Sequence, residues 1–152
     1  MSQKSLTTLL AQFEQAGIYR LSGTDYSTLE RSAEALSFAC FKVDLEGACD
    51  INAILTSLGR QLNFPDWYGA NLDALSDCLT DFSWRQAQGY IVTLTGTDAL
   101  QALPDSFATL NAVFASAIEQ WQDQGVPFWV FYEFGSTEVT AGLASLPVIN
   151  LQ

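Results

Sequence analysis

Short apolar segments alternate along this chain with amphipathic helical patterns. Apolar and polar side chains alternate strictly in residues 39–46, and residues 90–95 and 127–132 form two further runs of strand length. Apolar residues three and four apart predict helices between them, over residues 51–62, 72–82 and 105–124. Strands separated by helices pair in parallel through right-handed crossovers. We therefore predict an α/β fold in which a small parallel sheet is packed with helices.

The two ends of the chain differ in how much structure their sequences predict. Residues 5–16 and 27–37 show helical spacing, and a short strand pattern lies between them at residues 18–21. The last residues, from 135 onward, show little periodicity and are expected to be a surface tail or loop. No long linker or repeat divides the chain, so residues 1–152 are expected to form a single domain.

Composition excludes several classes of function. Seventeen Asp and Glu residues face six Lys and Arg residues, giving a net charge of −11, so direct binding of nucleic acid is not expected. The chain has no histidine, which removes Ser/His and Cys/His catalysis and His-based metal sites. No stretch has the length or apolar character of a membrane span or signal peptide. Three cysteines without a CxxC pair predict buried free thiols rather than a disulfide framework. We expect no cofactor, and a reducing cytoplasm fits these features together.

The most specific pattern lies in residues 64–82, where a loop leads into a helix whose expected N-cap is Asn71. Asp73, Asp77 and Asp81 recur every four residues on this helix and therefore share one face. Like charges at this spacing cost a few tenths of a kcal/mol per pair, and the helix dipole also disfavours an acid near the C-terminal end. Local helix structure therefore does not account for the last two acids.

Two neighbouring aromatic residues, Trp67 and Tyr68, lie in the loop before this helix. Adjacent bulky side chains do not both pack inward easily, so we expect one of them at the surface. Exposed aromatic residues beside charge are typical of protein-binding sites. Two other interpretations stay open: an ordinary solvated polar face, and an enzyme in which Asp73 and Asp77 act as acid and base or hold a metal.

Residues 64–80, which read FPDWYGANLDALSDCLT, resemble the most characteristic segment of the barstar family, the intracellular inhibitors of barnase-type ribonucleases. The strand at residues 41–47 and the helix after it resemble the start of that family's fold. The segment 90–95, the helix around Phe114 and the last strand follow in the family's order. The resemblance covers roughly residues 40–133, and its central block is specific.

This resemblance implies a barstar-like sheet of three parallel core strands within residues 39–133. Residues 1–38 then form a helix-strand-helix extension, which could add a fourth strand at the sheet edge and a covering helix. Residues 134–152 are left as a C-terminal tail.

The resemblance also implies a role for individual residues in blocking a nuclease. Asp77 would enter the phosphate-binding pocket among the nuclease's arginines, and Asp73 would hold a neighbouring basic residue. Trp67 takes the position of an aromatic residue that packs against the catalytic histidine, while Gly69 and Asn71 would contribute loop contacts. The predicted partner-binding residues are Trp67, Tyr68, Gly69, Asn71, Asp73, Ser76, Asp77 and Asp81.

The chain departs from the family pattern at two points of this surface. Ser76 stands where the best-known member has a large aromatic residue. The family's further acid on the long helix has no secure counterpart, because an apparent insertion of about one turn leaves both Glu119 and Asp123 as candidates.

From the sequence we therefore predict a non-enzymatic, cytoplasmic inhibitor that plugs the active site of a basic ribonuclease. The first alternative is an immunity or binding protein of the same fold for a different basic toxin or regulator. The second is a carboxylate-dependent hydrolase.

Overall fold

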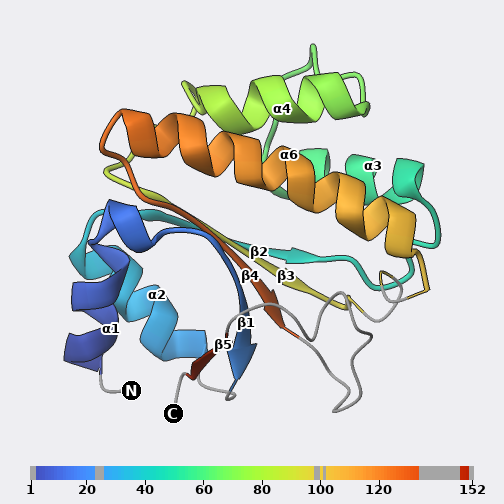
Figure 1. Ribbon diagram of the computed structural model, residues 1–152. Helices are drawn as coiled ribbons and strands as arrows, with labels where there is room; N and C mark the ends of the chain where they lie inside the picture. Colours follow the sequence, from blue (N-terminus) through green and yellow to red (C-terminus); the bar gives the residue numbers. More distant parts are fainter. Residues whose placement is uncertain (1–2, 23–25, 98–99, 101, 134–147, 151–152) are drawn as a thin grey trace.

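A five-stranded parallel sheet lies at the centre of the computed structural model (Figure 1). The structure describes residues 3–22, 26–97, 100, 102–133 and 148–150. The strand order is β2-β3-β4-β1-β5, so the chain begins near one edge and then crosses to the other. The strands are β1 (Ile18–Ser22), β2 (Ala39–Asp44), β3 (Tyr90–Thr95), β4 (Phe128–Glu133) and β5 (Val148–Asn150).

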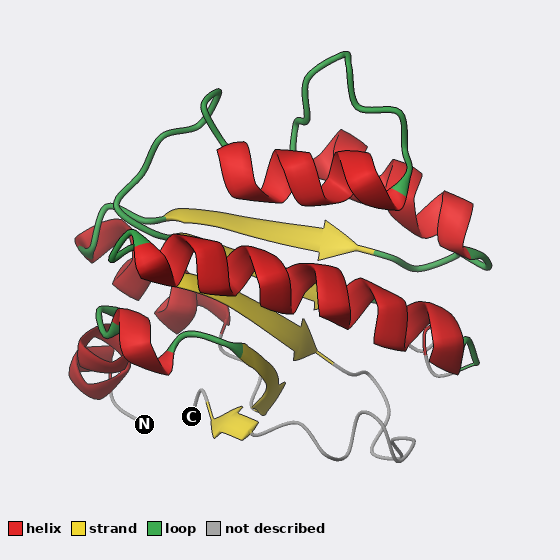
Figure 2. Ribbon diagram, turned by 45° about the horizontal axis from the view of Figure 1, so that its top comes forward, coloured by secondary structure: helices red, strands yellow, loops and turns green. Residues whose placement is uncertain are grey.

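Helices cover both faces of the sheet (Figures 1 and 2). One face carries α1 (Gln3–Leu10) and α2 (Tyr26–Ala35), with a short 3-10 helix η1 (Phe13–Gln15) leading into β1. The other carries α3 (Ile51–Gln61), α4 (Leu72–Asp81) and α6 (Pro104–Asp123), and α4 packs against α6 and α3. The predicted α/β fold with a small parallel sheet is confirmed.

Side chains of the central strands divide between two hydrophobic cores. In β4, Phe128, Val130 and Tyr132 face α3 and α6, whereas Trp129 and Phe131 face α1 and α2. All five are buried. A parallel strand covered on both faces has no polar side, which is why this segment reads as a continuous apolar run in the sequence.

The N-terminal residues join the sheet beside the last core strand. Strand β1 pairs with β4 in parallel, with Ile18 opposite Val130. A buried hydrogen bond ties α1 to the same strand, because the Trp129 Nε1–H donates to the carbonyl oxygen of Leu10 at 3.0 Å. The fourth strand expected from residues 1–38 is therefore present, at the side of β4 rather than beyond β2.

The sequence does not predict strand β5, because residues 148–150 lie in the stretch expected to be a tail or loop. The structure corrects that expectation by pairing these residues with β1 in parallel. A three-residue strand is held by backbone hydrogen bonds and is too short to show the side-chain period on which strand prediction depends. Among the helices that the structure describes, none has the length and hydropathy required to cross a bilayer.

Replacing Trp129 with Phe should destabilise the protein by about 1–3 kcal/mol, because the buried carbonyl of Leu10 would lose its donor. The measurement is urea unfolding followed by circular dichroism. Trp67→Phe is the matched control: Trp67 is 55% exposed, and the same change there should alter the free energy of unfolding by less than about 0.5 kcal/mol. Equal stability of the two variants would contradict the proposed tie between α1 and β4.

Candidate functional site

Helix α4 is held at both ends by its own sequence. At the start, the Oδ1 of Asn71 accepts a hydrogen bond from the backbone N–H of Ala74 at 2.8 Å, which confirms the predicted N-cap. At the end, Phe82 adopts a left-handed conformation with φ 47°, and its N–H donates to the carbonyl of Cys78. Because the Phe82 ring is buried, this end of the helix is fixed in the core.

The apolar side of α4 determines which way the helix faces. Leu75, Cys78 and Leu79 are fully buried beside α6. The Nε1–H of Trp121 on α6 donates to the carbonyl oxygen of Leu79 at 2.7 Å, joining α6 to the last turn of α4. With this side buried, the opposite side of α4 faces solvent.

The three acids of α4 lie on that solvent-facing side. Asp73, Asp77 and Asp81 are all exposed. Within the described part of the chain, no Lys or Arg side chain forms an ion pair with any of them. Asp81 differs from the other two because its Oδ2 accepts a hydrogen bond from the Ser83 hydroxyl at 3.3 Å. The face therefore presents negative charge that the described residues do not neutralise.

The loop before α4 separates its two neighbouring aromatic residues. Tyr68 is half-buried: its ring lies across Gly59 of α3, and its hydroxyl donates to the carbonyl oxygen of Leu55 at 2.7 Å. Phe64 meets the same ring edge-on, with 4.8 Å between ring centroids. Trp67, in contrast, is the residue that remains exposed. The prediction that one of the two aromatic residues reaches the surface is confirmed.

The backbone between the loop and the helix depends on a small residue at position 69. A Cβ on Gly69 would lie 3.0 Å from the Nδ2 of Asn71, close enough to disturb the capping side chain. The next residue, Ala70, already has φ 52°, in the left-handed region. Gly69 and Asn71 are both exposed, so they shape this turn and also border the acidic face.

The remaining candidates from the sequence are less accessible to a partner of the acidic face or lie away from it. Ser76 is half-buried, and its carbonyl accepts a hydrogen bond from the Thr80 hydroxyl at 2.9 Å. Glu119 and Asp123 are exposed on α6, two residues to either side of Trp121. Because a helix turns about 200° over two residues, both acids lie on the side of α6 away from the Trp121 contact with α4. The structure does not bring them to the acidic face of α4.

Gly59 also helps to position the loop before α4, although it is not among the site residues predicted from the sequence. It lies inside α3, and its missing side chain makes room for the ring of Tyr68. A glycine inside a helical pattern costs about 1 kcal/mol relative to alanine, so its presence there is itself a signal of close packing.

The environment of α4 keeps two titratable groups neutral at physiological pH. Burial, with a further contribution from the charges of Asp77 and Asp81, raises the pKa of the Cys78 thiol to about 11. Burial, followed by the interaction with Cys78, raises the pKa of Tyr68 to about 12. Cys78 therefore acts as a small apolar residue beneath the acids and not as a nucleophile.

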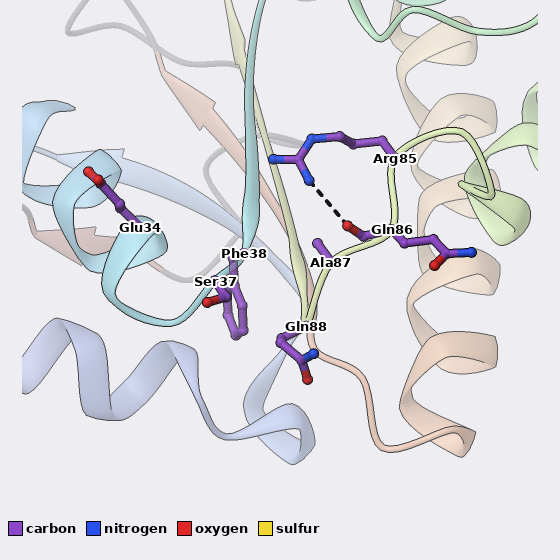
Figure 3. A pocket seen from close by; sticks show the side chains of 7 residues that line it. All are labelled: Glu34, Ser37, Phe38, Arg85, Gln86, Ala87 and Gln88. Atoms are coloured by element: carbon purple, nitrogen blue, oxygen red, sulfur yellow. Dashed lines mark hydrogen bonds between the residues drawn. The ribbon is translucent and has the colours of Figure 1, made fainter.

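Two depressions in the described surface are lined by other residues. One, of about 380 Å³, lies where β2 and β3 begin, between α2 and the loop that carries Arg85 (Figure 3). The Arg85 guanidinium donates to the backbone carbonyl of Gln86 at 3.2 Å in this loop. The other, of about 450 Å³, lies beside α6 and β1. None of the acids of α4 lines either depression.

Comparison with known families identifies the fold and the acidic helix together. The sequence model described as Barstar (barnase inhibitor) matches residues 38–133, which include β2, β3, β4 and the whole of the loop and helix described above. The chain belongs to the barstar family. The match begins after α2, so α1, β1 and α2 lie outside the part shared with the barstar family. A search of curated proteins finds no significant match.

Several solved structures of ORC proteins are similar to this chain. Two structures of the Aeropyrum pernix ORC2 protein, in ADPNP-ADP complexes and in the ADP form, give TM-scores of 0.58 and 0.61 at 17% and 16% identity. They cover 88% and 98% of this chain, which spans only 40% and 45% of theirs. Drosophila ORC bound to DNA gives 0.54 at 12% identity, covering 99% of this chain and 86% of that one. At these identities the likeness shows the fold alone.

Replacing Gly59 with Ala should destabilise the protein by about 1–2 kcal/mol, although alanine is the better helix former. The added Cβ would lie 2.4 Å from the Cε2 atom of Tyr68, so the ring and its loop must move. Urea unfolding measures the change in stability, and the NMR signal of the Trp67 indole N–H measures the movement of the loop. In a Tyr68→Ala background the same glycine substitution should be neutral or stabilising, and equal destabilisation in both backgrounds would show that Tyr68 is not the cause.

Stability should fall more steeply above pH 9 in the wild type than in a Cys78→Ala variant. The folded pKa of about 11 lies above the ordinary value of 9.0, so the neutral thiol stabilises the folded state below pH 9. That contribution is lost as the pH rises towards 11, which amounts to about 2 kcal/mol between pH 8 and 11. Urea midpoints measured across this range give the difference, and parallel curves for the two proteins would contradict it.

Proposed function

We propose that the chain is an inhibitor that covers the active site of a basic, barnase-type ribonuclease. The observation that carries this proposal is the exposed pair Asp73 and Asp77, four residues apart on a helix whose other side is buried. No cation among the described residues neutralises them. They belong to the segment matched by the barstar family, whose description names barnase inhibition.

The chemistry of the complex follows from what a ribonuclease binds. An enzyme that binds the RNA backbone has a cationic active site, because it must hold phosphate. A carboxylate resembles phosphate in charge and in its acceptor oxygens, and its hydrogen bonds to arginine are short and strong. We propose that Asp77 enters the phosphate site and that Asp73 pairs with a neighbouring cation. Trp67 extends from the loop to pack on the nuclease beside them, where an aromatic anchor excludes water.

Some of the other predicted site residues would contact the partner, and others hold the loop and helix in place. We propose that Gly69 and Asn71 meet the partner at the edge, since both are exposed next to the acidic face. Tyr68 acts chiefly through the protein, because its hydroxyl is already bonded to α3. Ser76, half-buried beside Asp77, leaves the central contact smaller than a large aromatic residue would. Asp81 lies at the rim, where its bond from Ser83 competes with a partner.

The net charge of −11 supports the same partner through the rate of encounter. Complementary net charges steer two proteins together before contact, whereas the close contacts determine how slowly they separate. The same charge would repel RNA, so the proposed inhibitor competes with the nuclease's substrate without binding it. Free thiols at all three cysteines support a reducing, cytoplasmic location for this action.

Two alternatives have less support from the structure. A different basic toxin or regulator would use the same surface, and the family match does not favour it over a ribonuclease. A hydrolase would need its carboxylates within a cleft, but Asp73 and Asp77 stand on an exposed helix face. We therefore propose that the chain acts by binding and not by catalysis.

Inhibition of purified barnase, measured against a fluorescent RNA substrate, tests the proposal. Asp77→Asn should weaken inhibition by about 2–5 kcal/mol, the range for removing one partner of a buried charge pair, for which barnase–barstar is itself a measured case. Glu34→Gln is the matched control: it makes the same change in charge on α2, across the sheet from α4, and should leave inhibition unchanged. Equal inhibition constants for the two variants would count against Asp77, and a wild-type protein without effect on barnase would favour a different basic partner.

A further inference from the structure

A groove of about 450 Å³ lies between α6 and the residues that lead into β1. Its apolar lining consists of Gly17, Ile18, Ala115 and Ile118, of which Ile118 is buried and the other three are at least partly exposed. Glu119, Gln122 and Asp123 complete its lining. Its volume is within the range of sites that hold ligand-sized groups.

Hydrogen bonds on both sides fix the shape of this groove. The Nε2 of Gln122 donates to the carbonyl oxygen of Phe13 at 2.9 Å, which ties α6 to η1. The carbonyl of Gly17 accepts from the backbone N–H of Val130 at 3.0 Å, which ties the entry of β1 to β4. One wall therefore comes from the barstar-family core and the other from residues before the family match. The N-terminal segment creates this surface.

The two acids of the groove occupy positions that the helix itself disfavours. Glu119 and Asp123 are four residues apart, so their like charges repel. Asp123 is the last residue of α6, where the helix dipole is also negative, and the last turn contains no basic residue. Neither acid forms an ion pair with a Lys or Arg side chain within the residues that the structure describes. A bound cation would relieve each of these unfavourable terms.

We propose that this groove binds an arginine or lysine side chain of a protein partner. The aliphatic stem of such a side chain would lie on Ile18 and Ala115, and its charged end would reach Glu119 and Asp123. A small inorganic cation would leave the apolar floor uncovered, and nucleic acid would be repelled by the acids. The chemistry therefore fits a basic protein segment in which Lys or Arg neighbours an apolar residue.

This site is separate from the surface proposed to bind a ribonuclease. Trp121 contacts Leu79 of α4 on one side of α6, whereas Glu119 and Asp123 lie about half a turn away. Both surfaces can be occupied at the same time. The N-terminal segment thereby gives this chain a second acidic docking surface. The experiment that tests this surface does not depend on whether the chain inhibits a ribonuclease.

Titration of the ¹⁵N-labelled full chain with acetyl-Leu-Arg-Leu-amide, followed by NMR, tests the proposal. The backbone amide signals of Gly17, Ile18 and Ala115 should shift with the arginine peptide and not with acetyl-Leu-Glu-Leu-amide. The double substitution Glu119→Gln/Asp123→Asn should weaken peptide binding about tenfold, since each exposed charge pair contributes up to about 1 kcal/mol. Glu30→Gln/Glu34→Gln makes the same change in net charge at an exposed i,i+4 pair on α2 and should leave peptide binding unchanged.

A second variant tests the groove by occupying it. Ala115 is exposed in the groove wall, and Ala115→Lys would supply a cation from within the chain. This variant should lose peptide binding while it keeps inhibition of barnase, if the wild type inhibits it. The proposal is overturned if the arginine peptide shifts none of these signals, if both peptides shift them equally, or if Ala115→Lys or the Glu119/Asp123 double variant binds the peptide as tightly as the wild type.

Discussion

Burial of one side of α4 against α6 determines what the rest of this surface can do. A helix with an acid every fourth residue presents those acids to solvent in a fixed direction only if its other side is packed against the protein. Leu75, Cys78 and Leu79 provide that attachment, and the Trp121 indole fixes it with a hydrogen bond to the last turn. The carboxylates therefore stay in water, where their charge costs little, and they remain available to an external cation.

In the loop before α4, the burial of one aromatic residue likewise leaves its neighbour exposed. Tyr68 is committed to α3 through its hydroxyl and through the space left by Gly59. With that ring fixed, Trp67 has no inward position and stays at the surface, next to the N-terminal end of the acidic face. A tryptophan side chain has only two side-chain torsions, so holding it against a partner costs little conformational entropy.

The N-terminal segment changes the molecule without changing the barstar-family core. By adding β1 beside β4, it extends the parallel sheet and covers the second face with α1 and α2. The likeness to ORC structures reflects this larger α/β arrangement, since those matches cover nearly the whole chain at low identity. The segment also forms one wall of the groove beside Glu119, which the family core would lack on its own.

Local sequence patterns specify strands β1 to β4, the helices, the cap at Asn71 and the shared face of Asp73 and Asp77. These features follow from local periods and local hydrogen bonds, which a single stretch of chain specifies. The tertiary structure sets which of the two aromatic residues turns inward, Tyr68, and which outward, Trp67, because the choice depends on a glycine in another helix. It also decided that Glu119 and Asp123 face β1 and not α4, and that residues 148–150 pair with β1. In each case the deciding contact joins two different elements of the fold, and the sequence pattern of neither element records it.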